Sequence, residues 1–192
     1  MPAKKPVQNE TMSELQKELG RSNPHALPVL KKVSVHVGIG SMVTGGNKDF
    51  SHVEKTLLDI TGQKPVVRKA RMAISNFKLR KGLPVGIHVT LRGDRMRDFI
   101  GRLVNIVLPR VRDFRGITVR GFDGSGNFSL GLDDCSIFPE VNQENMTKSH
   151  GIQINVCTTA RNNREAYLLL KALGFPFRDE VSVEGKFARK SQ

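Results

Sequence analysis

Two segments of the sequence alternate strictly between apolar and polar side chains. Residues 33–37 place Ser and His between three Val residues, and residues 85–91 place Gly, His and Thr between Val, Ile, Val and Leu. Because successive side chains of a strand point to opposite faces, each segment predicts a half-buried β-strand. Segments 66–67, 128–132 and 152–156 favour further strands, since they are rich in β-branched and large apolar residues. The chain must therefore bury one face of a sheet and can leave the other face in water.

Three amphipathic segments can cover the apolar face of this sheet. Apolar residues recur at helical spacing over residues 50–60 and again over residues 96–107, where Asp94 is a suitable N-cap. A third helix is expected to begin at Asn162, because Asn162 and Glu165 have the spacing of a capping box. The pattern predicts an α+β fold with two layers: a mostly antiparallel sheet with helices on one face and an open polar face.

The length of 192 residues fits one compact domain with tails. We expect a disordered polar N-terminal tail over residues 1–10, a single domain over residues 11–178 and a polar C-terminal tail over residues 179–192. A short helix is expected near the start of the domain, over residues 11–19. Residues 70–83 carry many cations and look like a long loop or a loosely paired hairpin.

The charge is strongly positive, and it is distributed unevenly. Lys and Arg number 31 against 18 acids, which gives a net charge of +13. A protein with this excess attracts polyanions, so nucleic acid, an anionic membrane and an acidic protein are the candidate partners. No run of about 18 apolar residues is present, and residues 1–10 do not resemble a secretory signal, so we expect a cytoplasmic protein without a membrane partner.

The stretch from Lys64 to Lys81 holds seven cations and no acid. It could be a solvated loop, but a run of one sign, with Asn76 and Phe77 interleaved, more often binds RNA phosphates. Phe77 could stack on a base or could anchor the loop in the core. A second basic cluster, Arg110–Gly116, is ambiguous between RNA and a protein partner.

Motifs for catalysis, cofactors and metals fail one by one. The Gly38–Val43 run lacks the third glycine of a dinucleotide fingerprint. The run that begins at Asp123 resembles a calcium loop, but its sixth position is Phe128, where such a loop needs Gly. The five His residues are dispersed, and Cys135 and Cys157 are expected to be reduced and structural. We therefore expect no enzyme, cofactor or metal site. A nucleotide- or RNA-modifying enzyme and a basic protein adaptor stay open as alternatives.

Short motifs along the chain resemble the ribosomal L-five family, in its bacterial branch. They begin in the basic stretch and continue in order to the C-terminal part of the chain: Gly62-Gln-Lys-Pro65, Asn76-Phe-Lys-Leu-Arg80, Val89–Met96, Leu108–Gly116, Phe122–Asn127 and Gly174-Phe-Pro-Phe177. The resemblance spans residues 12–178. The chain departs from the family pattern at His36, where Asn is common, and at Arg97, where Trp is frequent.

This resemblance implies a structural constituent of the large ribosomal subunit that binds 5S ribosomal RNA (rRNA) in the central protuberance. A basic loop is implied to contact the tRNA in the peptidyl (P) site. Another edge is implied to form an intersubunit bridge to a small-subunit head protein. The further partners implied are 23S rRNA and neighbouring central-protuberance proteins.

The resemblance and the polar sheet face together assign residues to three surfaces. Those expected to bind 5S rRNA are Lys32, Ser34, His36, Gly38, Gln63, Lys64, Arg68, Lys69, Arg71, Thr90 and Arg92. Those expected to contact tRNA are Asn76, Phe77, Lys78, Arg80 and Lys81. Those expected at the bridge are Arg110, Arg112, Arg115, Asn142 and His150.

Overall fold

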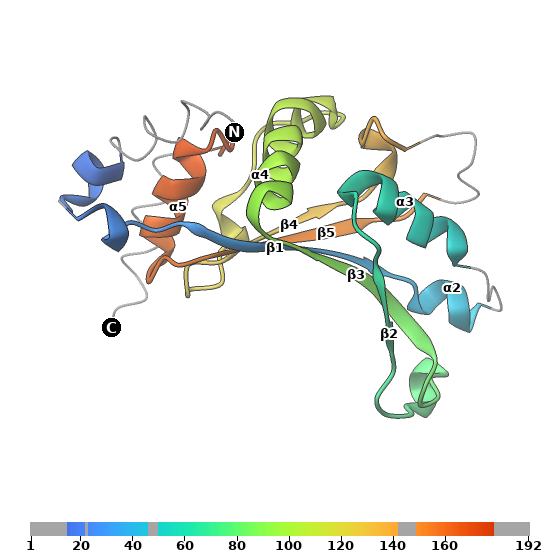
Figure 1. The fold of residues 1–192 in the computed structure, drawn as a ribbon. Coiled ribbons are helices and arrows are strands. Elements are labelled where there is room, and N and C mark those ends of the chain that lie inside the picture. Colours follow the sequence, from blue (N-terminus) through green and yellow to red (C-terminus); the bar gives the residue numbers. More distant parts are fainter. Residues whose placement is uncertain (1–14, 22, 46–49, 142–148, 179–192) are drawn as a thin grey trace. The chain divides into compact units, whose positions relative to one another are not determined.

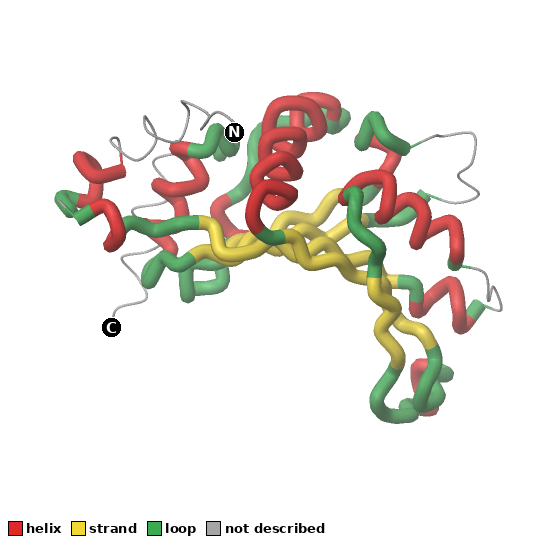
Figure 2. Tube along the Cα trace, in the orientation of Figure 1, coloured by secondary structure: helices red, strands yellow, loops and turns green. Residues whose placement is uncertain are grey.

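A computed structural model describes residues 15–21, 23–45, 50–141 and 149–178. Five strands form one sheet, in the order β2-β3-β1-β5-β4 (Figures 1 and 2). Their bounds are Leu30–Gly38 for β1, Val66–Lys69 for β2, Pro84–Leu91 for β3, Phe128–Leu132 for β4 and Ile152–Thr158 for β5. All five predicted strands are present, and the predicted α+β fold is confirmed. The two predicted tails lie outside the described residues, and the single domain over residues 11–178 stays a prediction.

The two alternating segments form the antiparallel pair β1 and β3. Val35 lies opposite Val89, and His36 lies opposite His88. The apolar members are buried, with Val35 fully enclosed and Val89 only 2% exposed. The polar members between them stay partly exposed. The alternation therefore sets both the register and the face that meets the core.

Helices occupy connections between strands and the segments before β1 and after β5. Helix α2 is Gly40–Thr44, α3 is Ser51–Thr61, α4 is Gly93–Arg102 and α5 is Asn163–Ala172; residues 15–19 are also helical. A π-helical turn, Leu103–Val107, and a 3-10 turn, Leu108–Arg110, continue α4. Further 3-10 turns are Pro24–Ala26, Ser75–Phe77, Val119–Gly121 and Cys135–Ile137.

Helices α3 and α4 lie on one side of β1 and β3 (Figure 1). Their apolar stripes are buried, as Leu57 on α3 and Phe99 on α4 illustrate. Arg102, near the end of α4, donates to the carbonyl oxygen of Ile60 on α3 at 3.1 Å and pairs with Glu140. These contacts cover the apolar face of the strands and leave their polar face without a helix from this group.

The predicted start of α4 is wrong, and the predicted start of α5 is right but lacks the hydrogen bonds of a capping box. Asp94 is not the N-cap of α4, because Arg92 takes that position and Asp94 pairs with Arg97 at 3.2 Å within the helix. Asn162 is the N-cap of α5, but its side chain makes no cap hydrogen bond. Glu165 instead accepts from the Arg161 main-chain N–H and from Arg21. A main-chain N–H just before the N-cap and an arginine distant in the sequence thus replace the reciprocal contacts of a capping box.

Contacts within the chain divide it into two compact units. Unit 1 comprises Met1–Lys31, Asp113–Ser129 and Val156–Gln192, and unit 2 comprises Lys32–Arg112 and Leu130–Asn155. In unit 1, Phe122, Phe128 and Phe177 form an aromatic cluster with neighbouring ring centroids 4.8–5.9 Å apart. In unit 2, the core lies between the apolar face of β1 and β3 and the helices α3 and α4.

Candidate nucleic-acid interface

A cluster of two histidines and an arginine lies on the polar face of unit 2. The rings of His36 on β1 and His88 on β3 stack, with centroids 5.6 Å apart and planes inclined by 11°. Arg68, on β2, donates from Nε to Nδ1 of His88 at 3.3 Å. The cross-strand register produces this cluster, because β3 pairs with β1 on one side and with β2 on the other.

A second polar group lies two residues further along the same strands. Ser34 is opposite Thr90 in the β1–β3 register. The Gln63 side chain donates from Nε2 to the carbonyl oxygen of Thr90 at 3.4 Å. Gln63 can reach this position because Gly62 ends α3 in the left-handed conformation, at φ +63°, and turns the chain sharply. Hydrogen-bonding groups therefore adjoin the histidine–arginine cluster.

Electrostatics keep the centre of this face ready for an anion. Burial lowers the pKa of His36 from its usual 6.5, and the charges of His88 and Arg68 lower it further. An RNA phosphate next to the cluster would oppose the lowering of the His36 pKa by these neighbouring charges, because an opposite charge favours the protonated ring. The site can thus hold the guanidinium of Arg68 beside the His36 ring, whose protonated form an approaching anion would favour.

The structure brings some of the predicted 5S-binding residues together and leaves others at the margins. Arg68, His36, Gln63, Ser34 and Thr90 share the polar face. Arg71 follows the end of β2 and Arg92 follows the end of β3, so in the antiparallel register they flank opposite ends of the paired strands. The remaining predicted residues are exposed or half-buried: Lys32, Gly38, Lys64 and Lys69.

His88 belongs to this surface, although it is not among the residues predicted above to bind 5S rRNA. It lies at the centre of the cluster, in contact with both His36 and Arg68. Its alternation with Ile87 and Val89 places it on the polar face, and this signal was available in the sequence. The pairing of His88 with His36 depends on the strand register, which the sequence alone does not fix.

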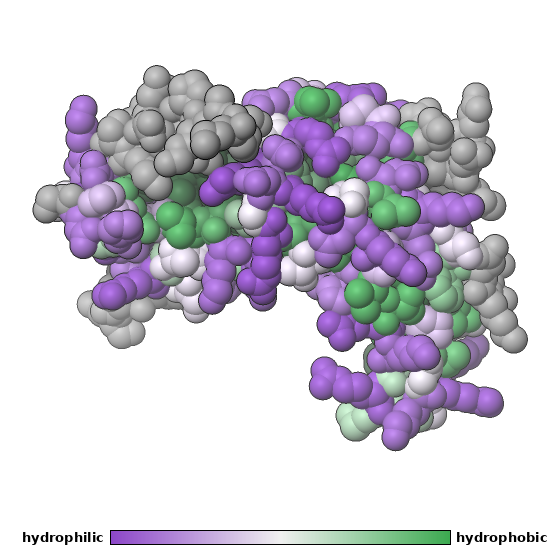
Figure 3. All heavy atoms as spheres, viewed as in Figure 1, coloured by the Kyte–Doolittle hydropathy of each residue, from purple (hydrophilic) through white to green (hydrophobic). Residues whose placement is uncertain are grey.

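The predicted tRNA loop is the tip of a hairpin that extends β2 and β3. The Ala70 N–H donates to the Leu83 carbonyl at 2.8 Å, and Ile74 and Leu79 form an isolated bridge nearer the tip. Phe77 is 67% exposed and Met72 is 73% exposed, so the alternative that Phe77 anchors the loop in the core is wrong. Asn76, Lys78, Arg80 and Lys81 are also exposed. Figure 3 shows mostly hydrophilic residues, in purple, projecting from this hairpin, with a few apolar residues, in green, among them.

The residues predicted for the bridge differ in their surroundings. Arg110 and Arg112 are exposed in unit 2, and Arg115 is exposed in unit 1. Asn142 lies outside the described residues. His150 is only 7% exposed, and its Nδ1 lies 3.6 Å from the Cys135 sulfur. Burial raises the pKa of the Cys135 thiol, which agrees with a structural cysteine.

Two family models cover most of the chain between them. The model described as ribosomal protein L5 matches residues 23–80, and a second model, for the C-terminus of the same ribosomal family, matches residues 84–177. A protein of Anaeromyxobacter sp. (strain Fw109-5), named large ribosomal subunit protein uL5, is 52% identical over 89% of this chain and 94% of its own length.

The chain belongs to the ribosomal L5 family.

Other relatives of the same name support this membership. The protein of Leifsonia xyli subsp. xyli is 47% identical over 91% of this chain and 89% of its own length. The protein of Thermosipho africanus is 46% identical over 93% of this chain and 98% of its own length. Members of the L5 family are structural proteins, so the chain is not an enzyme.

The described residues form neither a metal site nor a membrane span. Within residues 15–141 and 149–178, apart from the gaps noted above, no group of three or more His, Cys, Asp or Glu could hold a metal ion. No helix in this described part of the chain is long and apolar enough to cross a membrane.

Proposed function

We propose that this L5 family member binds 5S rRNA through the polar face of β1, β2 and β3. As a family member it is a structural constituent of the large ribosomal subunit, in the cytoplasm, and ribosomal RNA and ribosomal proteins are its partners. The observation that supports the finer proposal is the cluster of His36, His88 and Arg68 on a sheet face that α3 and α4 leave open.

This face has the groups that RNA recognition requires. Arg68 supplies a permanent charge for a phosphate, and the flat imidazole rings of His36 and His88 can stack on a base or a sugar. The hydroxyl groups of Ser34 and Thr90 can exchange hydrogen bonds with 2′-hydroxyls or base edges. The exposed cations at the margins, such as Arg71 and Arg92, can neutralise further phosphates.

The hairpin tip is proposed to contact the P-site tRNA. Lys78, Arg80 and Lys81 place three cations at an exposed tip, and Phe77 adds an exposed ring that can stack or pack on a sugar. Main-chain hydrogen bonds across the hairpin give this tip a defined form before any ligand binds. A projecting, positively charged loop of this kind suits the backbone of a folded RNA.

The contact with the small-subunit head is proposed for the exposed arginines of the second basic cluster. Arg110 and Arg112 follow α4, where the π-helical and 3-10 turns end the helix. Arg115 lies close to them in the sequence. Arginine is frequent in protein interfaces because its planar group can bind carboxylates in a bidentate manner. His150 is not part of this proposal, because it is buried.

Variants on the two RNA surfaces test the assignment. His36→Ala combined with Thr90→Ala should weaken 5S rRNA binding by about tenfold or more, because both residues are expected to contact the RNA. Replacing Lys78, Arg80 and Lys81 with Ala should leave 5S affinity within about twofold. The loop variant should instead reduce the chemical protection of P-site tRNA in ribosomes that carry it. Filter binding with labelled 5S rRNA measures the first two effects.

Lys55→Ala is the matched control, because Lys55 is an exposed cation on α3, which covers the other side of the sheet. It should change 5S affinity little beyond the general effect of one charge. A large loss of 5S affinity in the loop variant would contradict the division between the two surfaces.

A further inference from the structure

Unit 1 contains a half-open polar cavity that the proposed 5S surface does not use. Its volume is about 410 Å³, and its walls include Arg21, His25, Leu27, Thr159, Arg161 and Glu165. This volume lies within the range of pockets that bind small ligands, about 300–1,000 Å³. All of these residues belong to unit 1, so the cavity is a feature of that unit alone.

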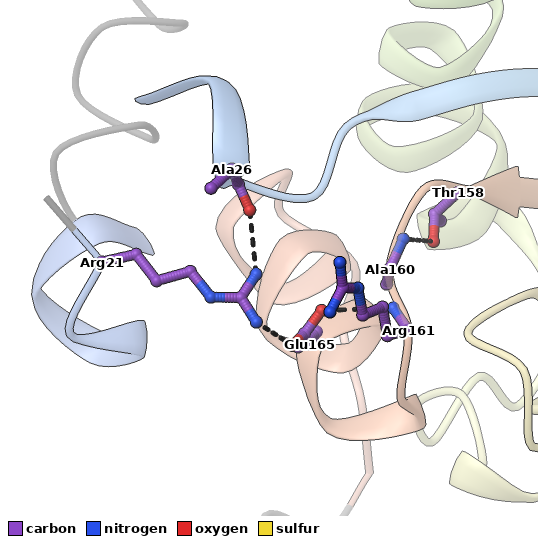
Figure 4. Close-up of polar contacts among 6 residues, drawn as sticks. All are labelled: Arg21, Ala26, Thr158, Ala160, Arg161 and Glu165. Atoms are coloured by element: carbon purple, nitrogen blue, oxygen red, sulfur yellow. Dashed lines mark hydrogen bonds and ion pairs between the residues drawn. The ribbon is translucent and has the colours of Figure 1, made fainter. Parts of the chain in front are cut away.

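A buried carboxylate organises one wall of the cavity. Glu165, on the first turn of α5, is 8% exposed, and its Oε1 lies 2.5 Å from Nη2 of Arg21. Its Oε2 accepts from the Arg161 main-chain N–H at 3.2 Å. Arg21 donates from Nη1 to the Ala26 carbonyl at 2.8 Å, so its guanidinium is held at two points. Figure 4 shows these contacts. Arg21 neutralises Glu165, and each carboxylate oxygen has a donor.

The second arginine is placed differently. Arg161 is exposed, and its side chain turns back toward Glu165 from the side opposite Arg21 (Figure 4). Its main chain is fixed, because the preceding Ala160 N–H donates to Thr158 Oγ1 at 3.0 Å. Arg161 also precedes the N-terminus of α5, where Asn162 supplies no side-chain cap. The positive end of the helix and the Arg161 charge therefore act at the same place.

The charge of the cavity suits one monoanion. Two arginines against one glutamate leave a net charge of +1 on the walls of the cavity. Arg21 uses two of its N–H groups in the contacts above, so it can still donate to a ligand. An RNA phosphodiester carries a single negative charge. Because the cavity is half open, the RNA strand on both sides of a bound phosphate can extend out of it.

We propose that this cavity binds a phosphate group of ribosomal RNA, with Arg161 as the main contact and Arg21 as a second donor that Glu165 holds in position. The proposal rests on the proposed function, because it takes rRNA as the source of the phosphate. It adds a contact in unit 1 to the sheet face in unit 2.

Arg161→Ala in the full chain tests the site, and Arg164→Ala is the matched control. Arg164 is an exposed arginine on the first turn of α5, and it does not line the cavity. Binding of each variant to 5S rRNA and, separately, to 23S rRNA should be measured over a range of KCl concentrations. For at least one of the two RNAs, Arg161→Ala should weaken binding about tenfold more than Arg164→Ala does and lower the slope of log K against log salt by about 0.7 to 0.9.

A parallel titration with inorganic phosphate distinguishes the source of the anion. Loss of phosphate binding in Arg161→Ala without any effect on either RNA would assign the cavity to a free anion and overturn the RNA proposal. Equal affinities and slopes for the two variants on both RNAs would overturn it as well. If the unmodified chain binds 5S rRNA no better than a control RNA, the proposed function itself fails, whatever the variants do. Equal melting temperatures of the two variants would show that neither difference arises from misfolding.

Discussion

His36 shows how a single residue can couple RNA binding to protonation. Its ring stacks on His88 and lies in the field of Arg68, and it stands where the family resemblance leads us to expect Asn. An Asn at this position can exchange hydrogen bonds but cannot gain charge. His36 therefore gives this chain a dependence on pH that an Asn would not give.

The lowered pKa of His36 predicts opposite pH effects on stability and on binding. Its pKa in the folded state lies below 6.5, because burial and then His88 and Arg68 disfavour the charged ring. Below pH 6.5 the unfolded chain thus takes up more protons, so the contribution of His36 to stability is present above 6.5 and is lost as the pH falls toward the folded pKa. A bound phosphate favours the charged ring, so 5S affinity should rise over the same range.

Urea unfolding and filter binding between about pH 7.5 and pH 5.5 measure the two effects. His36→Asn should reduce both of them, because an Asn side chain cannot take up a proton. Equal pH profiles for the unmodified chain and His36→Asn would contradict the role given to this residue.

The contacts of His88 and Glu165 could not be predicted from the sequence. The alternation of residues 85–91 places His88 on the polar face, but only the β1–β3 register places it against His36. Glu165 fits a capping box, yet it pairs with Arg21, which is 144 residues away in the sequence. No local pattern predicts such a partner, because tertiary packing brings the two elements together.

At the scale of elements, the strands and helices of unit 2 follow from periodicity. A period of two predicts β1 and β3, and helical spacing followed by Gly62 predicts α3 with its correct end. The π-helical turn at Leu103–Val107 was not predicted, since its apolar residues fit an ordinary α-helix equally well. The periodicity of apolar residues therefore predicts which face of a strand or helix is buried. The type of helical turn depends on packing against neighbouring elements.

The hairpin tip leads to a prediction about Phe77. Phe77→Ala should change the free energy of unfolding by less than about 0.5 kcal/mol, because the side chain is 67% exposed and contributes little to the core. Phe99→Ala, the control on α4, should cost about 3–5 kcal/mol, because Phe99 is 1% exposed. Chemical denaturation of both variants measures the difference. A loss of several kcal/mol on replacing Phe77 would mean that the ring anchors the loop after all.

At the scale of the whole molecule, charge and the open sheet face indicate a polyanion, and family membership specifies the large ribosomal subunit. The positive charge is concentrated in the first half of the chain, where residues 1–96 hold 17 basic and 7 acidic residues. That half contains β1, β2, β3 and the basic hairpin. The sequence could predict the class of ligand from this distribution, whereas the grouping of His36, His88 and Arg68 required the folded sheet.

The central claim is that the chain binds 5S rRNA specifically. The most direct test compares the affinity of the full chain for 5S rRNA with its affinity for an unrelated RNA of equal length, over a range of salt concentrations. We predict that 5S rRNA binds more tightly by at least about tenfold and that both affinities fall as salt rises, because phosphate contacts release counterions. Equal affinity for the two RNAs at every salt concentration would contradict the claim.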